Sequence, residues 1–155
     1  MQLPVAVRRL AFRSIYGILR IYWFVRQPEL SGVKCVLTDG DRVLLVRHTY
    51  GPRLWEVPGG AIKRHEPPSS AARREMREEL GIDVEDWRAL GEVSASICDR
   101  QGTLHCFHAP LSTRRIVPDP GELAAARWFA PTELPPNLGP YVASIIDRAR
   151  AVTAT

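Results

Sequence analysis

The spacing of apolar residues predicts a helix at the start of the chain and strands after it. Residues 5–25 (VAVRRLAFRSIYGILRIYWFV) are apolar over most of a helical wheel, and their polar residues fall on one narrow stripe. Residues 33–38 alternate as a strand does, and RVLLVR at 42–47 continues strand character after DGD at 39–41, a sequence typical of a hairpin turn. The first third of the chain thus predicts an amphipathic helix followed by a β-hairpin.

Shorter patterns predict further strands and two more helices. Strands are expected at residues 54–57, 82–84, 87–98, 103–109 and 126–129. A helix is expected from about Ser69, a favoured N-cap residue type, to Leu80, with Gly81 in the left-handed position that ends many helices. An amphipathic helix at residues 141–152 closes the chain, with four inward-facing residues: Val142, Ile145, Ile146 and Ala149. A length of 155 residues with 45% hydrophobic content suits one compact domain.

The helix that ends at Leu80 carries three carboxylates on one side. At about 100° per residue, Glu75, Glu78 and Glu79 fall within roughly a quarter of its circumference. Like charges at this spacing destabilise a helix by a few tenths of a kcal/mol per pair, so the arrangement favours a cation nearby. Oxygen ligands of this kind suit Mg²⁺ or Mn²⁺. The alternative is a solvated acidic face paired with Arg74 and its neighbours.

The spacing around this helix resembles the Nudix box, the signature of the Nudix hydrolase superfamily. The matching positions are Gly60, Glu66 after five residues, and REMREELGI at 74–82 after seven more. Weaker resemblance extends from about Ser31 to Leu134. It implies an α/β fold, an α/β/α sandwich around a mixed central sheet, with an extra N-terminal helix. The expected division is an N-terminal amphipathic helix at residues 1–28 and a Nudix domain at residues 29–155.

The resemblance also implies an activity and a set of site residues. Nudix enzymes hydrolyse a nucleoside diphosphate linked to another group, with Mg²⁺ or Mn²⁺ as cofactor. The expected metal ligands are the Gly59 carbonyl and the carboxylates of Glu75, Glu78 and Glu79. The expected catalytic residues are Glu78, Glu79 and Glu122, because the proton acceptor lies on the helix in some members and in a later loop in others. Glu66 and Arg74 are expected to orient the box through an ion pair.

The sequence leaves the substrate open between a nucleoside triphosphate and a nucleotide sugar such as ADP-ribose. The loop at residues 48–53 carries cations, an imidazole and an aromatic ring, so it either binds phosphate and base or is an ordinary polar connection. The expected substrate-binding residues are Arg47, Tyr50, Arg53 and Lys63. Some Nudix subfamilies carry residues past the box that mark their substrate specificity, and residues 95–99 contain none of these markers. An enzyme acting on an isoprenoid diphosphate by proton transfer is a further hypothesis, although no catalytic cysteine arrangement supports it.

Charge is unevenly distributed and raises a question about the N-terminal helix. The formal net charge is +4, and five arginines precede Glu29, the first acidic residue; without them the chain has 16 basic and 17 acidic residues. The polar stripe consists of Arg9, Arg13, Tyr16, Arg20 and Gln27. Arg13 and Arg20 interrupt any transmembrane span. The helix therefore packs on the domain, forms a homodimer contact, or makes a peripheral membrane contact through residues 5–27.

Other functions and compartments are less well supported by the sequence. Three cysteines without a CxxC pair indicate reduced thiols, and hence a cytoplasmic protein. No motif for sequence-specific nucleic-acid binding is present. An alternative to the enzyme is a non-catalytic binding module of the same fold, which recruits a membrane or protein partner through the N-terminal helix.

Overall fold

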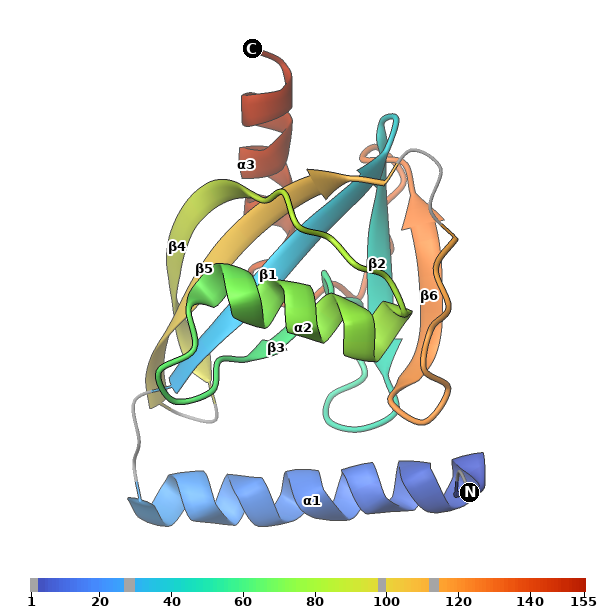
Figure 1. Ribbon diagram of the computed structural model, residues 1–155, viewed down its shortest axis with the longest axis vertical. Helices are drawn as coiled ribbons and strands as arrows, with labels where there is room; N and C mark the ends of the chain where they lie inside the picture. Colours follow the sequence, from blue (N-terminus) through green and yellow to red (C-terminus); the bar gives the residue numbers. More distant parts are fainter. Residues whose placement is uncertain (1–2, 27–29, 98–99, 112–114) are drawn as a thin grey trace.

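A mixed six-stranded sheet forms the centre of the protein (Figure 1). The computed structural model describes residues 3–26, 30–97, 100–111 and 115–155. The strands are β1 (Leu30–Asp39), β2 (Arg42–His48), β3 (Gly59–Ala61), β4 (Arg88–Ile97), β5 (Arg100–Pro110) and β6 (Leu123–Phe129). They run in the order β4-β5-β1-β2-β6, and β3 pairs with β1 outside this path. β1 and β5 are parallel, whereas the other pairs are antiparallel.

Two helices cover opposite faces of this sheet, α2 (Pro68–Leu80) in front and α3 (Val142–Thr153) behind (Figure 1). The alternation along β1 explains why both faces are covered. Val33, Cys35 and Leu37 join the core that contains the buried side of α2, whereas Val36 joins the core that contains α3. The predicted α/β/α sandwich is therefore confirmed. All four residues expected to face inward from the last helix are buried.

The largest departure from the expected strands lies just before the Nudix box. Residues 54–57 form only isolated bridges, Val46 with Glu56 and Trp55 with Leu138. The strand in this region is β3, which begins at Gly59, where the sequence predicted only the end of a strand. A Cβ atom on Gly59 would lie 2.0 Å from the Val33 carbonyl oxygen, so only glycine allows β3 to approach β1 this closely. Residues 82–84, another expected strand, belong to no strand.

α2 ends as expected but begins earlier. Its N-cap is Pro67 and Pro68 follows, so Ser69 lies inside the helix and no side chain caps its start. A proline suits the first turn because its fixed φ is helical and it has no N–H to satisfy. Gly81 takes the left-handed conformation, with φ of 64°. The stripe of Ala72, Met76 and Leu80 is fully buried, which fixes the rotation of the helix.

The N-terminal helix α1 (Val5–Arg26) lies across one end of the sandwich (Figure 1). It does pack on the domain, but not through its apolar side. The contacts come from its polar and aromatic side: Arg8 pairs with Asp119, and the Arg9 Nε donates to the Pro120 carbonyl over 3.0 Å. Gln27, expected on the same stripe, lies outside the described residues. None of the helices in the described ranges has the length and hydrophobicity needed to span a bilayer.

Candidate active site

Burial of α2 against the sheet turns two of its three carboxylates inward. Glu79 has only 1% of its surface exposed and Glu75 is also buried, whereas Glu78 is exposed. The two carboxylate oxygens of Glu79 have different partners. Oε1 lies 3.0 Å from the Nε2 of His48, and Oε2 accepts the backbone N–H of Gly59 over 3.3 Å. The carboxylate is thus held between the end of β2 and the start of β3.

Glu75 is fixed by an arginine that also holds the preceding loop. Arg74 donates to both oxygens of Glu66 at 2.8 and 2.9 Å and to the Glu75 Oε1 at 2.6 Å. The predicted ion pair between Glu66 and Arg74 is therefore confirmed. The Arg74 hydrogen bonds lower the pKa of Glu66 to about 2. Burial has the opposite effect on Glu75, whose pKa it raises despite the Arg74 contact.

A fourth carboxylate approaches this group from the loop before β6. Glu122 is half-buried, and its Oε1 accepts a hydrogen bond from the Tyr50 hydroxyl over 3.2 Å. Burial, followed by the charge of Glu79, raises the pKa of Glu122 to about 7. Burial and the charge of Glu122 also raise the pKa of Tyr50 well above its usual range. The site therefore concentrates negative charge where water screens it poorly.

The donor set fits a divalent cation. One ligand atom from each of His48, Glu79 and Glu122 lies within 4.8 Å of the others. Carboxylate oxygens and an imidazole nitrogen are ordinary ligands of divalent metals. This group shares Glu79 with the set expected from the sequence but replaces Glu75 and Glu78 by His48 and Glu122. The two sets are neighbours, because Glu75, Glu78 and Glu122 line one recess of about 440 Å³.

Gly60 makes this crowding possible. A Cβ atom there would lie 2.4 Å from the Glu75 carboxylate, so any other residue would displace that side chain. The fixed glycine of the box thus has a steric role beside the acidic helix.

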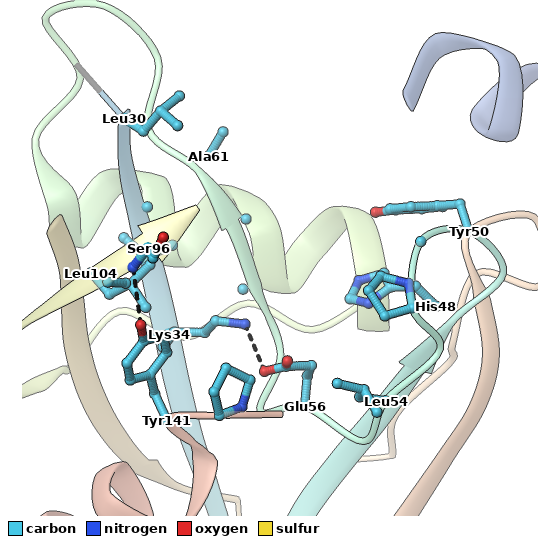
Figure 2. A pocket seen from close by; sticks show the side chains of 18 of the residues that line it. Leu30, Lys34, His48, Tyr50, Leu54, Glu56, Ala61, Ser96, Leu104 and Tyr141 are labelled. Atoms are coloured by element: carbon cyan, nitrogen blue, oxygen red, sulfur yellow. Dashed lines mark hydrogen bonds and ion pairs between the residues drawn. The ribbon is translucent and has the colours of Figure 1, made fainter. Parts of the chain in front are cut away.

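A second cavity, which we call the Tyr50–Tyr141 cavity, has a volume of about 410 Å³ and adjoins the carboxylates (Figure 2). Tyr50 and His48 lie at one side of it, and Tyr141 and Ser96 lie at the other. Lys34 and Glu56 form an ion pair of 3.0 Å between these two sides. The cavity is therefore bounded by aromatic rings and contains paired charges, as suits a ligand with both a ring and polar groups.

The four expected substrate-binding residues divide evenly. Tyr50 and Arg53 line the Tyr50–Tyr141 cavity. Arg47 is not among its lining residues, because its guanidinium lies over the Trp55 ring at 5.3 Å. Lys63 has an exposed side chain, and its backbone N–H and carbonyl both form hydrogen bonds with Glu66. Alternation along β2 explains the position of Arg47, since Leu45, two residues earlier, lies in the core that contains α3, whereas Leu44 and Val46 lie in the core that contains α2.

The sequence analysis placed His48 in a loop that either binds phosphate and base or is an ordinary connection, and it did not expect His48 beside a metal site. The alternation of side chains along β2 indicates the direction of His48, because Leu44 and Val46, at two-residue spacing before it, are buried under α2. No comparable signal exists for Lys34 and Glu56, which are 22 residues apart in the chain.

The contribution of α1 to the site was also missed. Phe12 stacks on Tyr50 with ring centroids 6.1 Å apart, and Tyr16 lies 5.3 Å from the same ring. Phe12 lines the acidic recess and Tyr16 lines the Tyr50–Tyr141 cavity. α1 therefore forms part of the wall of both.

Comparisons with known proteins agree with this architecture. Residues 28–149 match the family described as NUDIX domain. The chain is 25% identical to the MutT NUDIX hydrolase of Burkholderia pseudomallei, with a TM-score of 0.72 over 78% of this chain and 98% of that one. The solved structure thus shares the fold over almost its whole length.

Curated relatives match over parts of their length. The ADP-ribose pyrophosphatase of Mycobacterium tuberculosis is 45% identical over 51 residues, 32% of this chain and 25% of that protein. The NAD-capped RNA hydrolase NudC of Pseudomonas aeruginosa is 32% identical over 111 residues, 70% of this chain and 39% of that protein. The chain spans between a quarter and two fifths of these two relatives. Since the family match covers well over half of the chain, and the sheet and the box helix have the expected arrangement, the protein belongs to the Nudix family.

Proposed function

We propose that the protein is a divalent-metal-dependent pyrophosphohydrolase. Its substrate is a nucleoside diphosphate linked to another moiety, either a nucleoside triphosphate or a nucleotide sugar such as ADP-ribose. The observation that carries the proposal is the gathering of Glu75, Glu79 and Glu122 beside Gly59 and Gly60, next to a cavity of nucleotide size. Family membership and the names of the relatives support the same reaction class.

The acidic residues have a direct role in this reaction. Glu75, Glu78 and Glu79, with the Gly59 carbonyl, would hold Mg²⁺ or Mn²⁺, and His48 is near enough to Glu79 to complete the coordination. When bound, the cation neutralises charge on the phosphate oxygens. Arg74 keeps Glu75 in position through its short contact, and the buried stripe of α2 prevents the helix from turning the carboxylates away.

A carboxylate must also accept a proton from the attacking water. Glu78 and Glu122 both line the acidic recess. Glu122 is the better-positioned of the two, because it is half-buried and Tyr50 holds one of its oxygens, whereas Glu78 is exposed. We assign Glu122 as the proton acceptor and Glu78 as a metal ligand.

The Tyr50–Tyr141 cavity would hold the nucleoside portion. Tyr50 offers an aromatic face, Arg53 a cation near the phosphates, and the pair of Lys34 and Glu56 offers hydrogen-bonding groups. Arg47 and Lys63 are less well placed for such contacts. We further propose that residues 1–28 form an appendage to a catalytic domain at residues 29–155. A cytoplasmic location suits the free, buried thiols of Cys35 and Cys106.

A nucleotide panel tests this proposal. Nucleoside triphosphates and nucleotide sugars, including ADP-ribose, are incubated with Mg²⁺ or Mn²⁺, and the released nucleoside monophosphate and phosphate are measured. Glu79→Gln is expected to lower kcat/KM by roughly a hundredfold or more, because it removes a charged ligand from the centre of the site. Glu133→Gln changes an exposed carboxylate and serves as the matched control.

The outcomes separate the enzyme from the alternative of a binding module. Undiminished hydrolysis by the Glu79→Gln variant would remove the metal assignment. Lack of turnover of every nucleotide in the panel would favour a non-catalytic module of the same fold.

A further inference from the structure

The outer face of α1 is an unusual concentration of exposed apolar side chains. Among the described residues, ten large hydrophobic side chains are exposed, and nine of them lie between Leu3 and Tyr22. Leu10, Ile18 and Ile21 are each about two-thirds exposed, at 66%, 66% and 67%. On the helical wheel these three fall on one side, opposite the residues that contact the domain. A water-facing surface of this kind is typical of an interaction site.

The contacts of α1 with the domain leave this apolar face free. Arg8, Phe12 and Tyr16 form one stripe at intervals of four residues, and each contacts the domain. A helix that merely completed the hydrophobic core would present its apolar side to the sheet. Here the ion pair of Arg8 with Asp119 and the ring contacts with Tyr50 hold the helix the other way round. The fold therefore presents the apolar side outward.

Charge indicates which partner suits this face. The first 28 residues contain five arginines and no acidic residue. At about 100° per residue, Arg13 and Arg20 lie between the apolar face and the stripe that contacts the domain; both are exposed and border an open recess beside Tyr50. Long arginine side chains in this position can reach lipid headgroups while the apolar residues enter the acyl region. A second copy of α1 would instead bring five more arginines to the same place, with no carboxylate in this segment to neutralise them.

We propose that α1 docks the protein on the surface of an anionic lipid membrane. The helix lies in the plane of the interface, with Leu10, Ile18 and Ile21 inserted and Arg13 and Arg20 at the headgroups. Its 22 residues span about 33 Å, which suits a surface helix and needs no span across the bilayer. Because Phe12 and Tyr16 on the opposite side line the candidate active site, docking places that site next to the membrane surface.

Vesicle binding of the full chain tests this proposal without reference to hydrolysis. The protein is sedimented with vesicles of phosphatidylglycerol and phosphatidylcholine, and with vesicles of phosphatidylcholine alone. Binding is expected to the anionic vesicles and to weaken as salt is raised. The triple variant Leu10→Gln/Ile18→Gln/Ile21→Gln is expected to partition at least roughly tenfold more weakly, because it loses the inserted apolar surface.

Two controls keep the result interpretable. Val117 is 60% exposed and is the one exposed large hydrophobic side chain among the described residues that lies outside residues 3–22. Val117→Gln is expected to leave vesicle binding unchanged. Circular dichroism and thermal unfolding check that the triple variant remains folded. We expect that it does, because the three substituted side chains face solvent. Arg13→Gln/Arg20→Gln is expected to weaken binding to anionic vesicles while leaving the apolar face intact.

Three outcomes would overturn the proposal. They are absence of binding to anionic vesicles, binding by the triple variant equal to that of the native chain, and a dimer in solution that the triple variant loses without any vesicle binding. The last would assign the face to a second copy of the chain. Failure of the nucleotide panel would leave the vesicle result unaffected, so the two proposals fail independently.

Discussion

The carboxylate of Glu122 offers a sharp test of the charge balance in the acidic site. Its pKa is raised to about 7, first by burial and then by the charge of Glu79. In the unfolded chain a glutamate releases its proton near its ordinary pKa of 4.5. Between these values the folded protein keeps a proton that the unfolded chain has lost. The free energy of unfolding therefore falls as pH rises through this window.

The magnitude follows from the size of the shift. A difference of about 2.5 pH units corresponds to roughly 3 kcal/mol at 1.36 kcal/mol per unit. Solvent screening of the half-buried side chain reduces this to about 2 kcal/mol between pH 5 and pH 8. Glu122→Gln does not ionise and keeps an oxygen that can accept the Tyr50 hydrogen bond. Relative to the native chain, the variant should gain about 2 kcal/mol of stability between pH 5 and pH 8.

Urea unfolding in the presence of EDTA measures this difference. Metal-free conditions matter, because a bound cation would hold the carboxylate in its ionised form. Glu133→Gln, at an exposed position, should follow the pH dependence of the native chain. Groups far from Glu122 titrate equally in both proteins and cancel in the comparison. Parallel stability curves for the native chain and Glu122→Gln from pH 5 to pH 8 would refute the argument that burial and Glu79 oppose this charge.

Two further substitutions test the packing around the site. Gly59→Ala should destabilise the protein by about 3 kcal/mol in urea unfolding, because the new Cβ would lie 2.0 Å from the Val33 oxygen. The control Gly17→Ala, whose Cβ would have no atom within 4 Å, should be neutral or stabilising by up to about 1 kcal/mol. Equal effects of the two substitutions would contradict the steric argument. Trp87→Phe should lower the free energy of unfolding by no more than about 1 kcal/mol, measured by thermal unfolding. The buried Trp87 Nε1 has no hydrogen-bond partner among the described residues, and the ring contact with Phe107 is kept. A loss of about 3 kcal/mol, as for truncation to alanine, would show that the indole itself is needed.

Local patterns in the sequence were sufficient for the elements that carry the box. The three glutamates share one side of α2 because a helix repeats every 3.6 residues, and Gly81 ends it because glycine enters the left-handed region without a penalty. The four inward residues of α3 follow from the same period. Such features depend on neighbours within a few residues, so the sequence alone determines them.

Contacts between distant segments required the tertiary structure. His48 meets Glu79 across 31 residues, and Tyr50 meets Glu122 across 72. Neither residue type nor spacing predicts such a pair, because it depends on how the strands between them are ordered and registered in the sheet. The same holds for β3, whose pairing with β1 depends on the room that Gly59 leaves.

The orientation of α1 is the clearest case of this division. The sequence determined that residues 5–25 form an amphipathic helix with arginines on a narrow stripe. It left open which side would meet the domain, since hydrophobicity alone favours the apolar side. Asp119 and Tyr50, from loops far along the chain, supply the charge and the ring that bind Arg8 and Phe12. Only the folded arrangement of these loops decides that the apolar side faces outward.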